Sequence, residues 1–115
     1  MNLSDLNKLL NSELTTKINS SLIENDELLV NIEASNLQSV LLFLKSNVKC
    51  KFRQLIDIVP ADYPNEEKRF KIYYLLLSHE KNLRIKISIS LNIDEKIPSI
   101  TKIYPSANWM EREAF

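Results

Sequence analysis

Glycine is absent from this sequence of 115 residues, although an average usage of ~7% would give about eight glycines. Three kinds of functional site depend on glycine, because their backbone comes too close to a ligand or a turn to carry a Cβ atom. The dinucleotide-binding G-x-G-x-x-G turn, the phosphate-binding P-loop and the G-x-S-x-G nucleophile elbow are therefore excluded. Other residues must occupy left-handed backbone positions, and we expect asparagine to do so.

Cysteine, histidine and excess positive charge are also scarce. Cys50 cannot form an internal disulfide, which favours a reducing compartment, and His79 alone cannot supply a two-histidine metal site. Fifteen Lys and Arg balance fifteen Asp and Glu, with a pI of about 6.6. Nucleic-acid binding needs a basic excess or stripe, so we expect no nucleic-acid partner.

Long apolar runs are missing as well. The longest covers residues 72–77, far short of the ~20 residues that span a membrane. The first residues show no cationic region followed by an apolar run, so we expect no secretory signal. We expect any membrane association to come through a partner.

Apolar periodicity predicts the elements of the N-terminal half. Residues 3–18 carry leucine or isoleucine at spacings of three and four, which predicts an amphipathic helix. After a polar turn at residues 24–27, residues 28–32 are predicted as a short strand. A second helix is predicted to begin at Asn36, with its apolar face running to Val48.

The period changes in the C-terminal half. Residues 50–59 are predicted as a strand that Pro60 ends. Residues 70–78 are apolar on both faces, which predicts a central strand covered on both sides. Residues 83–91 alternate strictly between apolar and polar, so this strand has one buried face and pairs with the preceding one as an antiparallel hairpin. Residues 107–115 are predicted to begin a helix.

These elements predict an α+β fold. The expected order is helix, strand, helix, three strands and helix, with the helices packed on a mostly antiparallel sheet. No repeat, low-complexity tract or linker divides the chain, so we expect one domain over residues 1–115.

Two constellations could carry chemistry, and each has a simpler explanation. Cys50 and His79 could form a nucleophile and its base, which would make the chain a small hydrolase. Since Cys50 opens a predicted strand and His79 lies in a predicted hairpin turn, a buried or half-buried thiol and a solvated turn histidine are the favoured explanation. The acids Asp57, Asp62, Glu66 and Glu67 could bind a metal or act as paired carboxylates, but they interleave with Lys68 and Arg69, as a solvated charged loop would.

The C-terminal cluster offers a third candidate. On a helix, Trp109 and Glu113 share a face, and Arg112 lies between the carboxylates of Glu111 and Glu113. Those carboxylates could hold the guanidinium of Arg112 in a fixed orientation. The charged first turn of an ordinary helix explains the two acids about as well.

A series of short motifs resembles a known family. The motifs, in order, are Asp57, Asp62-Tyr63-Pro64, Arg69-Phe70, Tyr74-Leu75-Leu76-Leu77-Ser78, Asn82-Leu83-Arg84-Ile85, Pro98-Ser99 and Ala107-Asn108-Trp109-x-Glu111-Arg112-Glu113. Their order and spacing over residues 52–115 resemble the 30-kDa, C-type subunit of NADH:quinone oxidoreductase, respiratory complex I. In that family the last motif continues into an Asp-x-Phe-Gly-Ile stretch and a basic segment, so we expect that the chain is cut, naturally or not, at Phe115.

The resemblance implies a structural subunit of the peripheral arm. Such a subunit supports electron transfer from NADH to quinone, coupled to proton translocation, by docking against the D-type subunit of the complex. NADH, FMN, iron–sulfur clusters and quinone would bind to other subunits, since one cysteine cannot supply the four or so thiolates of a cluster. The complex would hold the chain on the cytoplasmic side of a bacterial inner membrane or the matrix side of a mitochondrial one.

The resemblance also implies which residues meet the partner. The expected interface consists of Asp62, Tyr63, Pro64, Arg69, Asn108, Trp109, Glu111, Arg112 and Glu113, with support from Asp57 and Arg84 in the sheet. Two alternatives remain open on the sequence alone. The chain could be a stand-alone α+β interaction domain, or the equivalent subunit of a related hydrogenase-type complex.

Overall fold

A computed structural model describes residues 2–65, 70–92 and 96–114, with α3 side chains up to Arg112. The elements in these ranges are α1 (Leu3–Glu13), β1 (Ile18–Glu24), β2 (Glu27–Ile32), a 3-10 turn (Ala34–Asn36), α2 (Leu37–Ser46), β3 (Gln54–Asp62), β4 (Phe70–Ser78), β5 (Leu83–Leu91) and α3 (Ala107–Ala114). These strands form one sheet in the order β1-β2-β5-β4-β3. Among them, β2 and β5 pair in parallel and all other neighbours are antiparallel. The predicted α+β class is confirmed.

The sheet is centred on β5, whose strict alternation of apolar and polar residues fixes its register. Ile87 lies opposite Tyr74 on β4 and opposite Val30 on β2, and all three side chains are buried. A shift of one residue would turn this apolar row to the other face of the sheet, so the register is strongly specified. The β4–β5 hairpin is the one that the sequence predicts.

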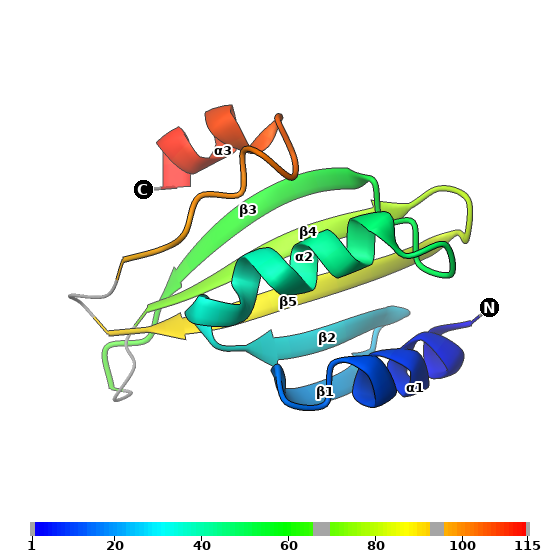
Figure 1. The fold of residues 1–115 in the computed structure, drawn as a ribbon. Helices are drawn as coiled ribbons and strands as arrows, with labels where there is room; N and C mark the ends of the chain where they lie inside the picture. Colours follow the sequence, from blue (N-terminus) through cyan, green and yellow to red (C-terminus); the bar gives the residue numbers. More distant parts are fainter. Residues whose placement is uncertain (1, 66–69, 93–95, 115) are drawn as a thin grey trace.

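The helices lie on one face of the sheet (Figure 1). The first helix, α1, contacts β1 and β2, and α3 contacts β3. Between them, α2 buries Leu37, Val40, Leu41 and Leu44. One hydrophobic core joins these leucines to the apolar row of the sheet. None of the described helices is long and apolar enough to cross a membrane.

The other face of the sheet is only partly covered. Along β4, residues alternate between buried and half-buried, so only Ile72, Tyr74, Leu76 and Ser78 are fully buried. The expectation of a strand covered on both faces is therefore wrong. The run of apolar residues was a misleading signal here, because the helices of residues 2–65, 70–92 and 96–114 cover one side of the sheet.

The first helix is shorter than predicted, and a strand follows it. The helix ends at Glu13, and Ile18 already belongs to β1. Asn2 and Asp5 form the capping box that starts α1, with 2.8 Å from the Asp5 N–H to the Asn2 Oδ1. The edge strand β1 is mostly polar and exposed, so it lacks the alternation by which strands are found. Its pairing with β2 makes it a strand.

Proline does not end β3, contrary to the prediction. The strand begins at Gln54, not at residue 50, and continues through Pro60 to Asp62. It forms the last strand of the sheet and pairs only with β4. A proline is tolerated on an edge strand, where its missing N–H faces away from the ladder.

Four described residues have left-handed backbone angles, and none is glycine. They are Asn25, Asp26, Lys51 and Asn82, with φ between 51° and 61°. Asn25 and Asp26 form the turn between β1 and β2, and Asn82 lies in the β4–β5 turn. Asparagine thus occupies two of the four positions, in partial agreement with the prediction.

Candidate interaction surface around helix α3

The helix α3 is mounted on a short ordered segment that packs into the core. Ile100 and Tyr104 are buried, and the Tyr104 hydroxyl donates a hydrogen bond to the Phe52 carbonyl oxygen just before β3. The Ala107 N–H donates to the Tyr104 carbonyl at 2.9 Å, where α3 begins. Ala107 is itself buried. The start of α3 is therefore fixed to the end of the molecule where β3 begins.

Glu111, on the inner face of α3, attaches the helix to the preceding segment at a second point. Its carboxylate accepts hydrogen bonds from the Ile100 N–H at 2.9 Å and from the Ser99 hydroxyl at 3.0 Å. Burial raises the pKa of the Tyr74 hydroxyl, and the Glu111 charge raises it further. No described contact joins Glu111 to Arg112, so the predicted pairing of these two side chains is not found. Glu111 therefore links α3 to the segment that precedes it.

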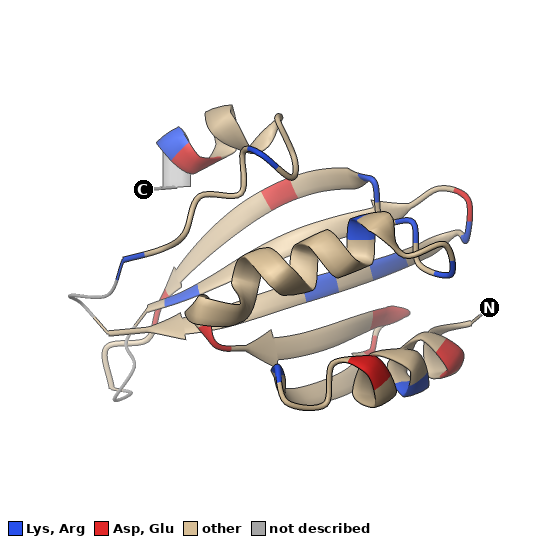
Figure 2. Ribbon diagram, viewed as in Figure 1, with Lys and Arg blue, Asp and Glu red and all other residues tan. Residues whose placement is uncertain are grey.

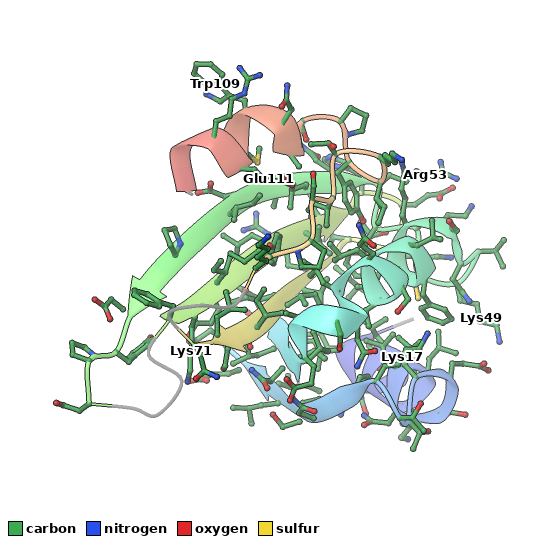
Figure 3. The ribbon with its side chains drawn as sticks, turned by 60° about the vertical axis from the view of Figure 1, so that its left-hand side comes forward. Lys17, Lys49, Arg53, Lys71, Trp109 and Glu111 are labelled. Atoms are coloured by element: carbon green, nitrogen blue, oxygen red, sulfur yellow. The ribbon has the colours of Figure 1, made fainter. Side chains whose placement is uncertain are left out.

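The outer face of α3 carries an exposed indole. The side chain of Trp109 is 66% exposed, and Asn108 and Arg112 are exposed beside it. Figure 3 shows Trp109 pointing away from the body of the protein, whereas Glu111 points inward. Tryptophan and arginine are the residues most enriched where protein interfaces concentrate their binding energy. A rigidly held, solvent-exposed tryptophan is therefore the clearest sign of a docking surface in the described chain.

The predicted loop of Asp62, Tyr63 and Pro64 lies at another place. Figure 1 shows it beyond the end of β3, whereas α3 lies beside that strand. Tyr63 is 38% exposed, its hydroxyl lies 3.3 Å from that of Tyr73, and the Lys71 ammonium lies 5.0 Å from its ring centre. Residues 62–65 line a shallow pocket of about 290 Å³.

Several predicted site residues fall outside the described chain. Arg69 is one of them, with the neighbouring acids Glu66 and Glu67, and the Glu113 side chain is another. Asp57 is exposed in an irregular part of β3, where its carboxylate accepts a hydrogen bond from the Ile58 N–H at 2.8 Å. Among the described residues, no three His, Cys, Asp or Glu side chains gather closely enough to hold a metal ion.

The candidate nucleophile and base do not have the properties of an active site. Cys50 is fully buried, and burial raises the pKa of its thiol to about 11, although the Lys81 charge opposes this rise. A raised pKa disfavours the thiolate, which is the nucleophilic form of cysteine. The His79 ring is exposed and hydrogen-bonds to the Gln54 side chain. These contacts agree with the simpler explanation, a buried thiol and a turn histidine.

Sequence reasoning missed two features at the surface of this protein. Ser99 and Ile100 hold Glu111 from twelve and eleven positions away, a separation that no periodic pattern reveals. A groove between α1 and α2 is the second feature. The exposed Leu42, an apolar residue outside the predicted apolar face of that helix, is the one signal that could have indicated it.

Comparison with known proteins identifies the family. The family described as "Respiratory-chain NADH dehydrogenase, 30 Kd subunit" matches residues 30–115. The C-type subunit of the NADH-quinone oxidoreductase of Chelativorans sp. is 38% identical over 113 residues, which are 98% of this chain and 56% of that protein. The protein of the same name from Ruegeria pomeroyi is 46% identical over 89 residues, 77% of this chain and 44% of that protein.

A third relative agrees with these two. The C-type subunit of the NADH-quinone oxidoreductase of Rhodospirillum rubrum is 39% identical over 113 residues, which cover 98% of this chain and 53% of that protein. The chain spans about half the length of the curated relatives it matches. The family match begins at residue 30, well before the motifs that suggest the resemblance. This chain therefore belongs to the family of the 30-kDa subunit of the respiratory-chain NADH dehydrogenase.

Proposed function

We propose that this chain is a structural part of NADH:quinone oxidoreductase that docks against the D-type subunit of the complex through the outer face of α3. In this role it supports electron transfer from NADH to quinone, coupled to proton translocation, and takes no part in the chemistry itself. The exposed Trp109 on a firmly held helix is the observation that carries the proposal. A rigid aromatic loses little conformational freedom on binding and so makes an efficient anchor.

The loop at the end of β3 extends the proposed interface. Tyr63 is held by Tyr73 and Lys71 on the sheet, and its exposed side is available to a partner. Asp62, Pro64 and Arg69 belong to this second contact in our proposal. Since the loop and α3 lie at different places along β3, the partner would have to span the length of that strand.

We propose that the cofactors of the complex bind elsewhere. A single cysteine cannot supply the thiolates of an iron–sulfur cluster, and a chain without glycine lacks the usual backbone cradles for dinucleotide phosphates. The high pKa and burial of Cys50 also argue against a thiol nucleophile. NADH, FMN and quinone are therefore assigned to other subunits, and the chain would reach the membrane only through the complex.

Substitution at Trp109 tests the docking proposal. We expect Trp109→Ala to lower the yield of the D-type subunit that co-purifies with the tagged chain by about tenfold, as loss of an anchor tryptophan does. Arg112→Ala should act in the same direction but less strongly. Leu22→Ala is the matched control, because Leu22 is 54% exposed on β1, away from α3. Equal recovery with all three variants would contradict the proposal.

A further inference from the structure

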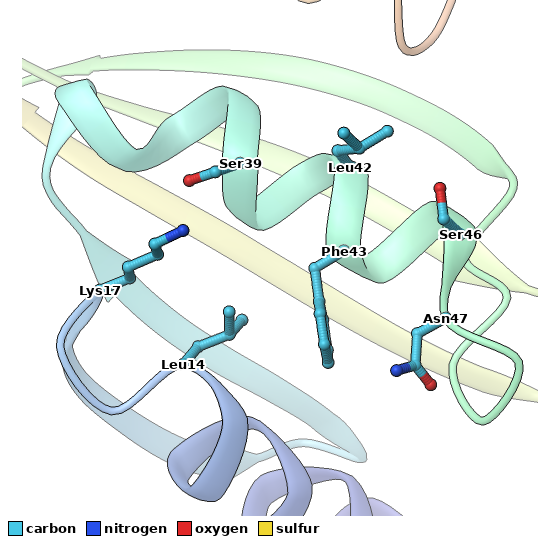
Figure 4. A pocket seen from close by; sticks show the side chains of 7 residues that line it. All are labelled: Leu14, Lys17, Ser39, Leu42, Phe43, Ser46 and Asn47. Carbon is cyan, nitrogen blue, oxygen red and sulfur yellow. The ribbon is translucent and has the colours of Figure 1, made fainter.

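An apolar groove separates the end of α1 from α2. It is open to solvent and has a volume of about 480 Å³. Its lining consists of Leu14, Leu42 and Phe43, together with Lys17 and polar side chains of α2 and its C-cap that include Asn47. Figure 4 shows the side chains of Lys17 and Phe43 reaching into the space between the two helices. Leu42 is 53% exposed. No residue of the described chain closes this groove.

Positive charge borders the groove at one end. Lys49 follows Asn47 by two positions, and its N–H donates to the Asn47 side chain at 2.8 Å. Between them stands Val48, which is 73% exposed. Neither Lys17 nor Lys49 has an ion-pair partner among the described residues. The groove therefore offers apolar contact along its length, with Lys17 in its lining and Lys49 two residues beyond Asn47.

The segment that forms the α2 side of the groove carries positive charge only, although the whole chain is neutral and the segment that supplies Leu14 and Lys17 is acidic overall. Residues 34–56 carry four cations and no carboxylate, whereas residues 1–33 carry six carboxylates and two lysines. Figure 2 shows the cations gathered at the C-terminal end of α2 and in the loop that follows. Glu13, which precedes Leu14, is exposed and does not line the groove. Potentials of opposite sign steer partners and select among them.

We propose that this groove docks an acidic amphipathic segment of another protein. Its apolar side chains would cover Leu14, Leu42 and Phe43, and its carboxylates would pair with Lys17 and Lys49. Helix-in-groove recognition of this kind uses apolar anchors along one side of the bound segment. None of the lining residues comes from α3, so the proposal does not depend on docking through Trp109.

A binding experiment on the whole chain tests the proposal. The probe is a short synthetic peptide with leucine on one helical face and glutamate on the other, titrated into isotope-labelled protein. We expect amide shifts at Leu42, Phe43 and Asn47. The double variant Lys17→Glu/Lys49→Glu should weaken binding by about tenfold or more, since it turns two attractions into repulsions.

The control variant is Lys8→Glu/Lys96→Glu, which changes the net charge equally at two exposed lysines outside the groove. We expect it to bind the peptide within about twofold of the parent, because only local charge matters at physiological salt. Equal loss in both variants, or equal binding of a peptide with lysine in place of glutamate, would overturn the proposal. So would stronger binding to anionic phosphatidylglycerol vesicles than to the peptide, or occupation of the groove by a second copy of the chain.

Discussion

At the scale of single residues, the C-terminal motif divides its work between the inside and the outside. Glu111 faces inward and binds Ser99 and Ile100, whereas Trp109 and Arg112 face solvent. The motif looks in sequence like one charged surface, but its residues have two separate roles. Glu111 attaches the helix to the preceding segment, whereas Trp109 and Arg112 are exposed on the outer face of the helix.

Replacing Glu111 should destabilise the fold. In Glu111→Ala the N–H of the buried Ile100 loses its charged acceptor, and the Ser99 hydroxyl loses its carboxylate partner. We expect the free energy of unfolding to fall by about 1.5–3 kcal/mol, the range for a hydrogen bond to a charged group. Urea denaturation followed by circular dichroism measures the change.

The neighbouring Arg112→Ala is the control for that measurement. Arg112 is exposed and has no described partner, so its loss should change stability by less than about 0.5 kcal/mol. Equal effects of the two substitutions would show that Glu111 does not tie α3 to the preceding segment.

At the scale of elements, the sequence predicted the central elements well and the two edge strands of the sheet poorly. The strong alternation of β5 and the leucine face of α2 were sufficient to predict both elements. The edge strand β1 carries no such signal, because an exposed edge has no buried face to require apolar residues. Pro60 led to a predicted strand that was too short at its C-terminal end, since a proline ends a central strand but not the outermost one. Which strand lies at the edge is a property of the whole sheet.

The connection between α2 and β3 contains a strained backbone. Lys51 has a φ of 53°, a conformation that is unfavourable for a side chain with a Cβ atom. Its ammonium group also pairs with Glu80 at 2.9 Å, and this pairing lowers the pKa of the Glu80 carboxyl. Cys50 and Phe52 are buried on either side, which holds Lys51 in place. Glycine would fit this position better.

A pair of substitutions at Lys51 separates the backbone effect from the ion pair. Both Lys51→Gly and Lys51→Ala remove the pair with Glu80, but only glycine relieves the left-handed conformation. We expect Lys51→Gly to be more stable than Lys51→Ala by about 1 kcal/mol. Chemical denaturation of the two proteins checks this difference. Identical unfolding curves would mean that Lys51 is not held at a positive φ.

At the scale of the whole molecule, the described part of the chain is a sheet with helices on one side, and three of its outer surfaces are candidates for docking. One is the outer face of α3 around Trp109, one is the loop at Tyr63, and one is the groove between α1 and α2. Such surfaces suit a subunit that touches several neighbours. The sequence motifs indicated the first two, whereas the groove emerged only when two helices far apart in the sequence came together.

The sequence motifs were sufficient to indicate the family but not the orientation of their side chains. The motifs suggest the family because several short patterns occur in the right order, and the family match extends further towards the N-terminus. The orientation of each motif side chain was not predictable, because it depends on which face of α3 meets the core. The hydrogen bonds from Ser99 and Ile100 to Glu111 could not be foreseen for the same reason, and its place in the interface stays a prediction.

The central claim, that the outer face of α3 meets the D-type subunit, has a direct test in the only tryptophan of the chain. Trp109 can be replaced biosynthetically by 5-fluorotryptophan, which gives a single fluorine NMR signal without a substitution elsewhere. We predict that adding the purified D-type subunit shifts and broadens this signal, because the exposed indole becomes buried. A complex that forms while the signal stays at its free position would contradict the claim.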